Sequence, residues 1–270
     1  MSQAAHIVWS PLVRTLSDGV VAASPRPRAI AISGAQGSGK TTLAALLTDD
    51  LVARGVRAMT CSLDDFYYPR ARRLELARDV HPLLITRGVP GTHDVELCER
   101  VLDDVRRVPA PIPRFDKALD DRIEPARWPV VGPVEVAILE GWCLGARPQA
   151  DAALTAPVND LERVDDGDGR WRRYVNAQLE VRYRALFERF DRWIYLRVPD
   201  FAAVTRWRGE QELALPVERR MDGARLARFV AHYERITRWM FDDAPARADV
   251  TVVLDDGHRI ANVVTRAGAR

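Results

Sequence analysis

The sequence predicts an α/β fold of three layers, in which helices cover both faces of a mostly parallel, doubly wound sheet. Short apolar runs at 29–33, 134–139, 193–198 and 250–254 alternate with longer stretches of helical periodicity, an order typical of parallel strands joined by crossover helices. The run 134–139 is almost entirely apolar, as expected of a strand buried on both faces. The chain of 270 residues is 47% apolar, which is enough for a substantial core.

The chain is expected to form one domain behind a short leader. Residues 1–27 form the leader, which can be a helix packed on the domain edge, and the prolines Pro25 and Pro27 at its end favour an extended connection to the first strand. Residues 28–270 then form a single domain, and the sequence contains no internal repeat.

A glycine-rich loop follows the first strand. Its pattern is GxxxxGK[ST], and it lies between the apolar run 29–33 and the helical stretch 42–47, which is the context that a phosphate-binding loop, or P-loop, requires. Glycine lets successive backbone N–H groups turn inward around phosphate oxygens, and the start of the following helix adds a positive field. The predicted nucleotide-binding residues of this loop are Gly34, Ala35, Gln36, Gly37, Ser38, Gly39, Lys40, Thr41 and Thr42.

Two side chains of the P-loop have distinct chemical roles. The Lys40 amine would reach the β- and γ-phosphates of ATP, and the Thr41 hydroxyl would ligate Mg²⁺. Average composition gives a chance match to this motif on the order of once in a hundred chains of this length. We therefore predict ATP and Mg²⁺ as cofactors, in preference to a glycine-rich turn that binds nothing.

The next elements follow the same periodicity. Leucines at helical spacing continue the first helix until Gly55, and residues 57–63 form the next strand. A long irregular stretch then leads to a helix whose N-cap is Asp94 and whose apolar face includes Cys98 and Val101.

The second half of the chain continues the alternation. Residues 164–169 are rich in aspartate and glycine but miss the spacing of an EF-hand, so we interpret them as a solvated surface loop. A long helix over 171–190 precedes the strand 193–198, and two more helices are expected over 200–214 and 223–241. The run 250–254 is expected to be the last strand.

Three carboxylates stand at the ends of predicted strands. Asp64 and Asp65 close the second strand, and Glu140 closes the strongly apolar strand 134–139. In a doubly wound sheet the ligand lies at the carboxyl ends of the strands, and phosphoryl transfer needs one carboxylate for the metal and another for the acceptor hydroxyl. We predict Lys40, Asp64, Asp65 and Glu140 as catalytic residues, Asp64 as the base with Asp65 able to exchange roles with it, and Thr41, Asp64 and Glu140 as metal ligands.

Arginines near the end of the chain are candidates for a closing lid that screens the charge of the transferred phosphoryl group. Arg206 and Arg208 lie in one helical stretch, and Arg219 and Arg220 follow it. Of these, Arg206 is predicted to contact the nucleotide. A solvated helix face explains either pair nearly as well.

Composition excludes several classes of partner. Forty basic and thirty-eight acidic residues leave a formal charge of +2 without a basic stripe, so nucleic acid is not expected. No apolar run is long enough for a membrane span or a signal peptide. Cys61, Cys98 and Cys143 match no metal-binding pattern, which favours a reduced, cytoplasmic protein. No obligate protein partner is evident.

The motifs together resemble those of the D-glycerate 3-kinase family of plants, fungi and bacteria, which belongs to a wider group of P-loop kinases including uridine kinase, pantothenate kinase and phosphoribulokinase. The resemblance covers about residues 28–260, and a surface loop near 148–169 is locally divergent. Its motifs are the P-loop with Gln36, the 62–67 strand end, and the segments 87–94, 113–117, 139–145 and 206–212.

The resemblance implies a three-layer P-loop kinase fold and an ATP-dependent enzyme that phosphorylates a hydroxyl, most simply D-glycerate to 3-phosphoglycerate. It also implies that Asp64 is the base. Arg87, His93, Arg114 and Lys117 lie in the irregular segments between the second strand and Glu140, and as a cluster they are expected to bind the carboxylate of the acceptor.

Two alternatives remain open at this point. The enzyme could act on another small acceptor, such as a nucleoside, pantothenate or another sugar acid, because the motifs only border the acceptor pocket. A nucleotide-binding regulator without an acceptor is the alternative from another class. Such a protein would need Lys40 and Thr41 but not a base, so Asp64 and Asp65 favour the enzyme.

Overall fold

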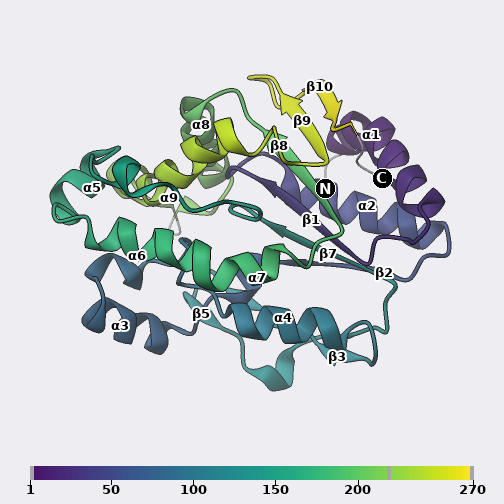
Figure 1. Ribbon diagram of the computed structural model, residues 1–270, viewed down its shortest axis with the longest axis horizontal. Helices are drawn as coiled ribbons and strands as arrows, with labels where there is room; N and C mark the ends of the chain where they lie inside the picture. The colour runs from purple at the N-terminus through teal and green to yellow at the C-terminus, as the bar shows by residue number, and fades with distance from the viewer. Residues whose placement is uncertain (1–2, 218–219, 268–270) are drawn as a thin grey trace.

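The computed structural model describes residues 3–217 and 220–267, and its central feature is a sheet of six strands in the order β10-β9-β8-β1-β7-β2 (Figure 1). Five of these strands are parallel, and β10 at one edge is antiparallel to β9. This arrangement confirms the predicted α/β class. The strands of the sheet are β1 Ala29–Gly34, β2 Ala58–Ser62, β7 Val136–Gly141, β8 Arg192–Arg197, β9 Val250–Leu254 and β10 Ile260–Thr265.

Helices form the outer two layers. The chain supplies α1 Gln3–Ala22, α2 Lys40–Ala53, α3 Arg70–Asp79, α4 Val95–Asp104, α5 Asp160–Asp165, α6 Arg170–Gln178, α7 Arg184–Phe187, α8 Phe201–Leu213 and α9 Gly223–Asp243. Helices α1 and α2 pack together on one face of the sheet, with the side chains of Ile30 and Ile32. Helices α4, α6 and α7 pack on the other face (Figure 1). Within residues 3–217 and 220–267, no helix has the length and apolar character needed to cross a lipid bilayer.

The elements that sequence periodicity missed lack an apolar stripe. Strand β10 is exposed along nearly its whole length because it lies at the sheet edge, so no alternating pattern marks it. Helix α3 buries only Arg73 and Leu76. Four two-residue strands also lie in the segment expected to be irregular: β3 Ala110–Pro111, β4 Phe115–Asp116, β5 Asp121–Arg122 and β6 Val130–Val131.

The predicted helix over 171–190 contains an interruption. Helix α6 passes into a π-helical turn, Leu179–Tyr183, before α7 begins. A π-helical turn holds one more residue than an α-helical turn, so it rotates the following side chains by about 100° about the helix axis. Apolar periodicity does not reveal this insertion, because Leu179 and Tyr183 within the turn and Leu186 after it are all buried.

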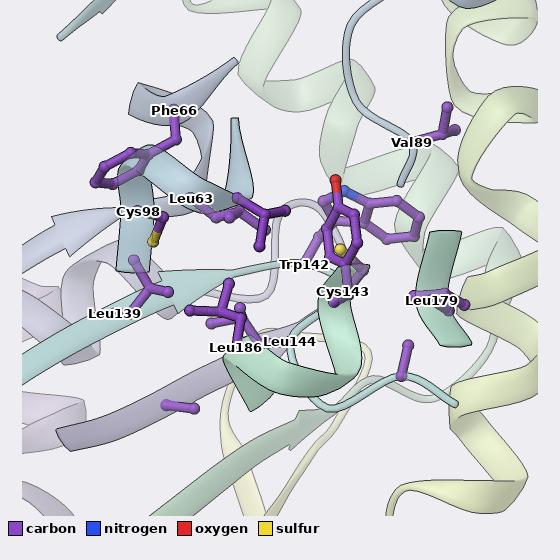
Figure 2. Packing of buried hydrophobic residues seen from close by; sticks show 14 of the residues in the cluster. Leu63, Phe66, Val89, Cys98, Leu139, Trp142, Cys143, Leu144, Leu179 and Leu186 are labelled. Carbon is purple, nitrogen blue, oxygen red and sulfur yellow. The ribbon is translucent and has the colours of Figure 1, made fainter. Parts of the chain in front are cut away.

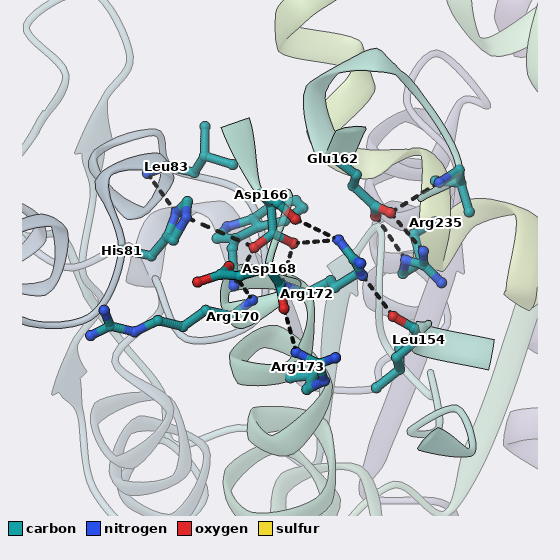
Figure 3. A network of polar contacts seen from close by, with 12 residues as sticks. His81, Leu83, Leu154, Glu162, Asp166, Asp168, Arg170, Arg172, Arg173 and Arg235 are labelled. Atoms are coloured by element: carbon teal, nitrogen blue, oxygen red, sulfur yellow. Dashed lines mark hydrogen bonds and ion pairs between the residues drawn. The ribbon is translucent and has the colours of Figure 1, made fainter. Parts of the chain in front are cut away.

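The interpretation of 164–169 as a solvated loop is wrong for Asp166, whose side chain is fully buried. Its carboxylate accepts hydrogen bonds from the backbone N–H groups of Trp171 and Arg172 and pairs with the Arg172 guanidinium (Figure 3). Nearby, the buried Glu162 carboxylate pairs with Arg235 of α9. These pairs fix the starts of α6 and α5, so the acidic side chains serve packing.

One core cluster contains all three cysteines. Cys61 in β2, Cys98 in α4 and Cys143 after β7 are free thiols and are buried between the sheet and the helices α4, α6 and α7. Figure 2 shows Cys98 and Cys143 among Leu139, Leu186 and their neighbours. Burial raises the pKa of all three thiols, that of Cys61 to about 12.

Candidate active site

The P-loop and the predicted carboxylates meet at the carboxyl ends of adjacent strands. Strand β7 lies between β1 and β2, and Glu140 is in register with Ile32 on one side and with Ser62 on the other. Asp64 follows β2 in a short 3₁₀ turn, Leu63–Phe66, and its backbone N–H donates a hydrogen bond to the Ser62 hydroxyl, which caps the turn. Parallel pairing therefore brings the P-loop, Glu140 and Asp64 to one edge of the sheet, as the strand-end argument predicts.

A cavity of about 1050 Å³ opens at this edge. Its volume is ample for a nucleotide and a small second molecule. Of the residues proposed from sequence, it is lined by Gln36, Gly37, Gly39, Lys40, Thr41, Thr42, Asp64, Arg87, Lys117, Glu140 and Arg208. The remaining lining comes from Tyr67, Ala118, Leu119, Trp142, Gln211, Glu212, Leu215, Met221, Phe229 and Tyr233.

The P-loop backbone has the conformation that a phosphate cradle needs. Gly37 and Gly39 have φ angles of 80° and 89°, in the left-handed region that glycine adopts without strain. Lys40 begins α2, and its amine donates a hydrogen bond to the Ala35 carbonyl at 3.1 Å, across the loop. Burial lowers the pKa of Lys40, while the carboxylates of Glu140 and Asp64 act in the opposite direction. The amine thus lies between two anionic groups, in a place where phosphate oxygens can replace its contact with Ala35.

The donor set beside Lys40 suits a magnesium ion. The Thr41 hydroxyl donates a hydrogen bond to Oε1 of Glu140 at 3.0 Å, and both residues line the cavity with Asp64. Hydroxyl and carboxylate oxygens are the ligands that Mg²⁺ accepts, usually together with phosphate oxygens and water. Glu140 is only 6% exposed. Within the described part of the chain its carboxylate accepts a hydrogen bond from Thr41 alone, which leaves lone pairs for a metal or its water.

Asp64 is held between a cation and a phenol. Its Oδ2 lies 2.6 Å from Nζ of Lys117, and its Oδ1 accepts a hydrogen bond of 2.8 Å from the Tyr67 hydroxyl. Burial alone would raise the pKa of this carboxyl, but the charge of Lys117 and the two hydrogen bonds outweigh it and lower the pKa to about 2. Asp64 is therefore ionised at neutral pH and can accept a hydrogen bond from a hydroxyl.

Asp65 points elsewhere. Its carboxylate accepts a hydrogen bond from the Phe115 N–H at 3.2 Å and pairs with Arg114 at 3.0 Å, and neither Asp65 nor Arg114 lines the cavity. Burial raises the pKa of Asp65, with Arg114 opposing it. The pair fixes strand β4 against the turn that carries Asp64, so it supports the site from behind.

Of the other candidates for binding the acceptor, Arg87 lines the cavity and His93 does not. The Arg87 side chain lines the cavity, pairs with Asp120 and donates to the Lys117 carbonyl at 3.3 Å. His93 is 1% exposed and lies behind the wall, with its ring stacked on Tyr67 at 4.5 Å between centroids. Arg87 and Lys117 thus face the predicted acceptor region, whereas His93 and Arg114 do not.

Helix α8 presents the second lid arginine. Arg208 lines the cavity and pairs with Glu212 at 2.7 Å, whereas Arg206 pairs with Asp256 at 2.8 Å and lies outside the lining. Arg219 lies outside the described residues. The rotation of about 200° between helix positions two apart explains why only one of Arg206 and Arg208 can face the P-loop.

Sequence reasoning missed the wall that helix α9 supplies. Phe229 and Tyr233 project from α9 into the lining, and Met221 precedes that helix. In sequence they belong to an ordinary amphipathic helix, and no motif marks the positions that face a ligand. Tyr67 and Trp142 belong to the quoted motifs, but their side chains had no assigned role.

Comparison with known proteins agrees with this geometry. No protein-family model matches the chain. An uncharacterized kinase, mug58, of Schizosaccharomyces pombe is 33% identical over 222 residues, covering 77% of this chain and 79% of the yeast protein. The chloroplastic D-glycerate 3-kinase of Arabidopsis thaliana is 30% identical over 251 residues, covering 84% of this chain, which spans about half (52%) of that protein.

A solved structure of a D-glycerate 3-kinase has a similar fold. The structure of D-glycerate 3-kinase from Cryptococcus neoformans superimposes with a TM-score of 0.77 at 24% identity, covering 94% of this chain and 99% of the other. At that identity the likeness concerns the fold alone. The sequence relatives carry the family assignment. The chain therefore belongs to the P-loop kinases related to D-glycerate 3-kinase.

Proposed function

We propose that this kinase transfers the γ-phosphoryl group of ATP to the primary hydroxyl of D-glycerate, giving 3-phosphoglycerate. One observation carries the proposal: an ionised carboxylate, Asp64, shares a cavity with the P-loop and with two cationic side chains, Arg87 and Lys117. An ATP-binding regulator needs the P-loop but not the other three groups. A kinase for a small anionic alcohol uses all of them.

The roles follow from position. The amides of 34–41 and the Lys40 amine hold the phosphates, and the Asp64 carboxylate orients the acceptor hydroxyl towards the γ-phosphorus and takes its proton. As the new O–P bond forms, the bond from the γ-phosphorus to the β,γ-bridging oxygen breaks and ADP leaves. In such a loose transition state positioning and charge supply most of the catalysis, which suits a carboxylate of low proton affinity.

Thr41, Glu140 and Asp64 would hold a Mg²⁺ ion at this edge of the cavity. A bound Mg²⁺ would neutralise charge on the β- and γ-phosphate oxygens.

Arg208 on α8 adds a positive charge on the far side of the cavity. Its pairing with Glu212 keeps that guanidinium oriented until a phosphate competes for it.

The acceptor end of the cavity favours a small acid. Arg87 and Lys117 lie beside Asp64, and Trp142 and Tyr233 complete this part of the lining. A carboxylate that pairs with Arg87 or Lys117 replaces ion pairs that these cations now make with Asp120 and Asp64. Displacement of Lys117 from Asp64 by the substrate carboxylate frees Asp64 for the hydroxyl, so binding of the acid prepares the base. The names of the plant relative and the fungal structure agree with D-glycerate.

The test is release of ADP by the purified chain with ATP and Mg²⁺ in the presence of D-glycerate, L-glycerate, uridine or pantothenate. We expect turnover with D-glycerate that is lost in Lys40→Ala and retained in Arg127→Ala, which changes an exposed arginine outside the cavity lining. Turnover with another acceptor alone would replace D-glycerate but keep the kinase. ATP binding without acceptor-dependent ADP release would contradict the enzyme and favour a nucleotide-binding regulator.

A further inference from the structure

The loop of residues 87–94 carries Arg87 into the cavity, yet most of the loop is buried. Val89, Thr92 and His93 are each 1% exposed or less. Gly88 and Gly91 have positive φ angles of 136° and 98°. Arg87 is therefore the first residue of a loop whose position depends on the side chains that pack against its buried residues.

Aromatic side chains contact this loop at its backbone. A Cβ atom at Gly88 would lie 2.1 Å from the Tyr233 hydroxyl, and one at Gly91 would lie 2.7 Å from the Tyr174 ring. Both distances are shorter than any real contact, so the glycines allow the rings to touch the main chain. The Trp142 indole donates to the Gly88 carbonyl at 2.8 Å, and the Tyr233 hydroxyl donates to the Arg87 carbonyl at 3.2 Å.

Tyr183 makes the contacts nearest the middle of the loop. Its hydroxyl accepts a hydrogen bond from the Gly91 N–H at 3.0 Å and lies 2.6 Å from Nδ1 of His93. The hydroxyl oxygen can accept two hydrogen bonds and can also donate its own proton, so its contact with Nδ1 forms with either tautomer of the His93 ring. Burial lowers the pKa of His93 to about 3, so the ring is neutral. One hydroxyl thus joins two loop residues, Gly91 and His93.

The π-helical turn places the Tyr183 side chain against the 87–94 loop. Tyr183 is the last residue of the turn Leu179–Tyr183, and it is fully buried. Leu179 of the turn and Val89 of the loop belong to one core cluster (Figure 2). A π-helical turn is rare and is found often at functional sites. Here its extra residue changes which side of the helix faces the loop.

Unlike Trp142 and Tyr233, Tyr183 is not part of the cavity lining. Substitution of its hydroxyl therefore removes no direct contact with ATP or acceptor. Any effect on acceptor affinity must pass through the loop.

We propose that Tyr183 is a positioning residue for acceptor binding: its hydroxyl, placed by the π-helical turn, holds the 87–94 loop so that the Arg87 guanidinium faces the cavity. This inference rests on the proposed function for its kinetic consequence. Its structural part, that the Tyr183 hydroxyl holds the loop at Gly91 and His93, stands on the contacts alone. Among residues 3–217 and 220–267, the hydrogen bonds and ring contacts of Tyr183 do not include the P-loop, so we expect nucleotide binding to be independent of it.

The test compares the wild-type chain with Tyr183→Phe and with the control Tyr195→Phe. Tyr195 is a buried tyrosine of β8, and among the described residues its hydroxyl has no hydrogen bond. Loss of a buried hydrogen bond typically changes an equilibrium about tenfold. We expect Tyr183→Phe to raise the KM for D-glycerate about tenfold with the KM for ATP within twofold, and Tyr195→Phe to change neither. A parallel rise of both KM values would overturn the proposal, because it would indicate a general structural defect.

Backbone amide hydrogen exchange gives a second readout that needs no turnover. In Tyr183→Phe the amides of 87–94 should exchange at least tenfold faster, while those of 34–41 keep the wild-type rate. Unchanged exchange in 87–94 would overturn the proposal whatever the kinetics show. If the wild-type chain does not use D-glycerate, the proposed function fails, and the exchange experiment still decides whether Tyr183 holds the loop.

Discussion

Nζ of Lys117 lies 2.6 Å from Oδ2 of Asp64, and this ion pair covers one oxygen of the carboxylate that we propose as the base. The lysine side chain is 61% exposed, whereas that of Asp64 is 28% exposed. Lys117 can therefore leave into solvent while the carboxylate stays. Movement of this one long side chain would uncover the proposed base, which would help to protect ATP from hydrolysis before the acceptor arrives.

Adjacent aspartates allow a matched pair of variants. Asp64→Asn removes the proton acceptor, and we expect kcat to fall about a thousandfold with ATP binding unchanged, as measured by calorimetry and ADP release. Asp65→Asn leaves Arg114 without its carboxylate, and we expect a loss of about 1–2 kcal/mol in unfolding free energy with a small effect on kcat. Equal loss of kcat in both variants would contradict the assignment of Asp64 as the base.

The arginines of α8 give a second comparison. Arg208→Ala should lower kcat about ten- to a hundredfold, because Arg208 lines the cavity and can contact the phosphates. Arg206→Ala tests the nucleotide contact predicted from sequence. Its pairing with Asp256 outside the cavity leads us to expect a change of about twofold or less. A larger loss for Arg206→Ala than for Arg208→Ala would show that α8 rotates when ATP binds.

The buried pair between Glu162 and Arg235 should dominate the stability of the segment around α5. The Arg235 guanidinium donates to both carboxylate oxygens, at 2.7 and 2.6 Å. Glu162→Gln leaves a buried guanidinium without its counter-charge, for which we expect a loss of about 3–5 kcal/mol in urea unfolding. Asp160→Asn on the same helix breaks an exposed pair and should cost about 0.5 kcal/mol or less. Similar losses of unfolding free energy in the two variants would contradict the expectation that the buried pair contributes more to stability than the exposed pair.

His232 makes stability depend on pH. Burial lowers its pKa to about 4, against about 6.5 for an unfolded histidine. Between these values the unfolded chain binds a proton that the folded chain does not, so unfolding free energy falls as the pH falls from 6.5 to 4. His232→Asn does not titrate. Between pH 7.5 and pH 5 the variant should lose about 2 kcal/mol less than the wild type in urea unfolding, and equal losses would exclude His232 as the source.

Local chemistry explains what the sequence could predict of the fold and the site. The glycine conformation of the P-loop and the pairing of β1, β7 and β2 are properties of short segments, and they place Lys40, Asp64 and Glu140 in one cavity without further information. The Asp94 cap of α4 is local in the same sense, since its carboxylate accepts from the Leu97 N–H.

Contacts between distant segments could not be predicted. Whether Asp64 or Asp65 faces the cavity depends on Arg114 and Phe115, some fifty residues further along the chain. The burial of His93 behind Tyr67 depends on Tyr183, and the identity of the wall residues depends on how α9 crosses the sheet. The π-helical turn leaves no signal in the pattern of apolar residues. In each case the missing information is a long-range packing choice.

The three buried cysteines give the molecule an internal reporter. A thiol that is sheltered from water and has a raised pKa reacts slowly with alkylating reagents, so each of Cys61, Cys98 and Cys143 becomes reactive only when its surroundings open. They lie on β2, on α4 and just after β7, three parts of the same core beneath the catalytic edge. Mass spectrometry of alkylated peptides can therefore follow separately the opening of three places in the unaltered protein, with and without ATP.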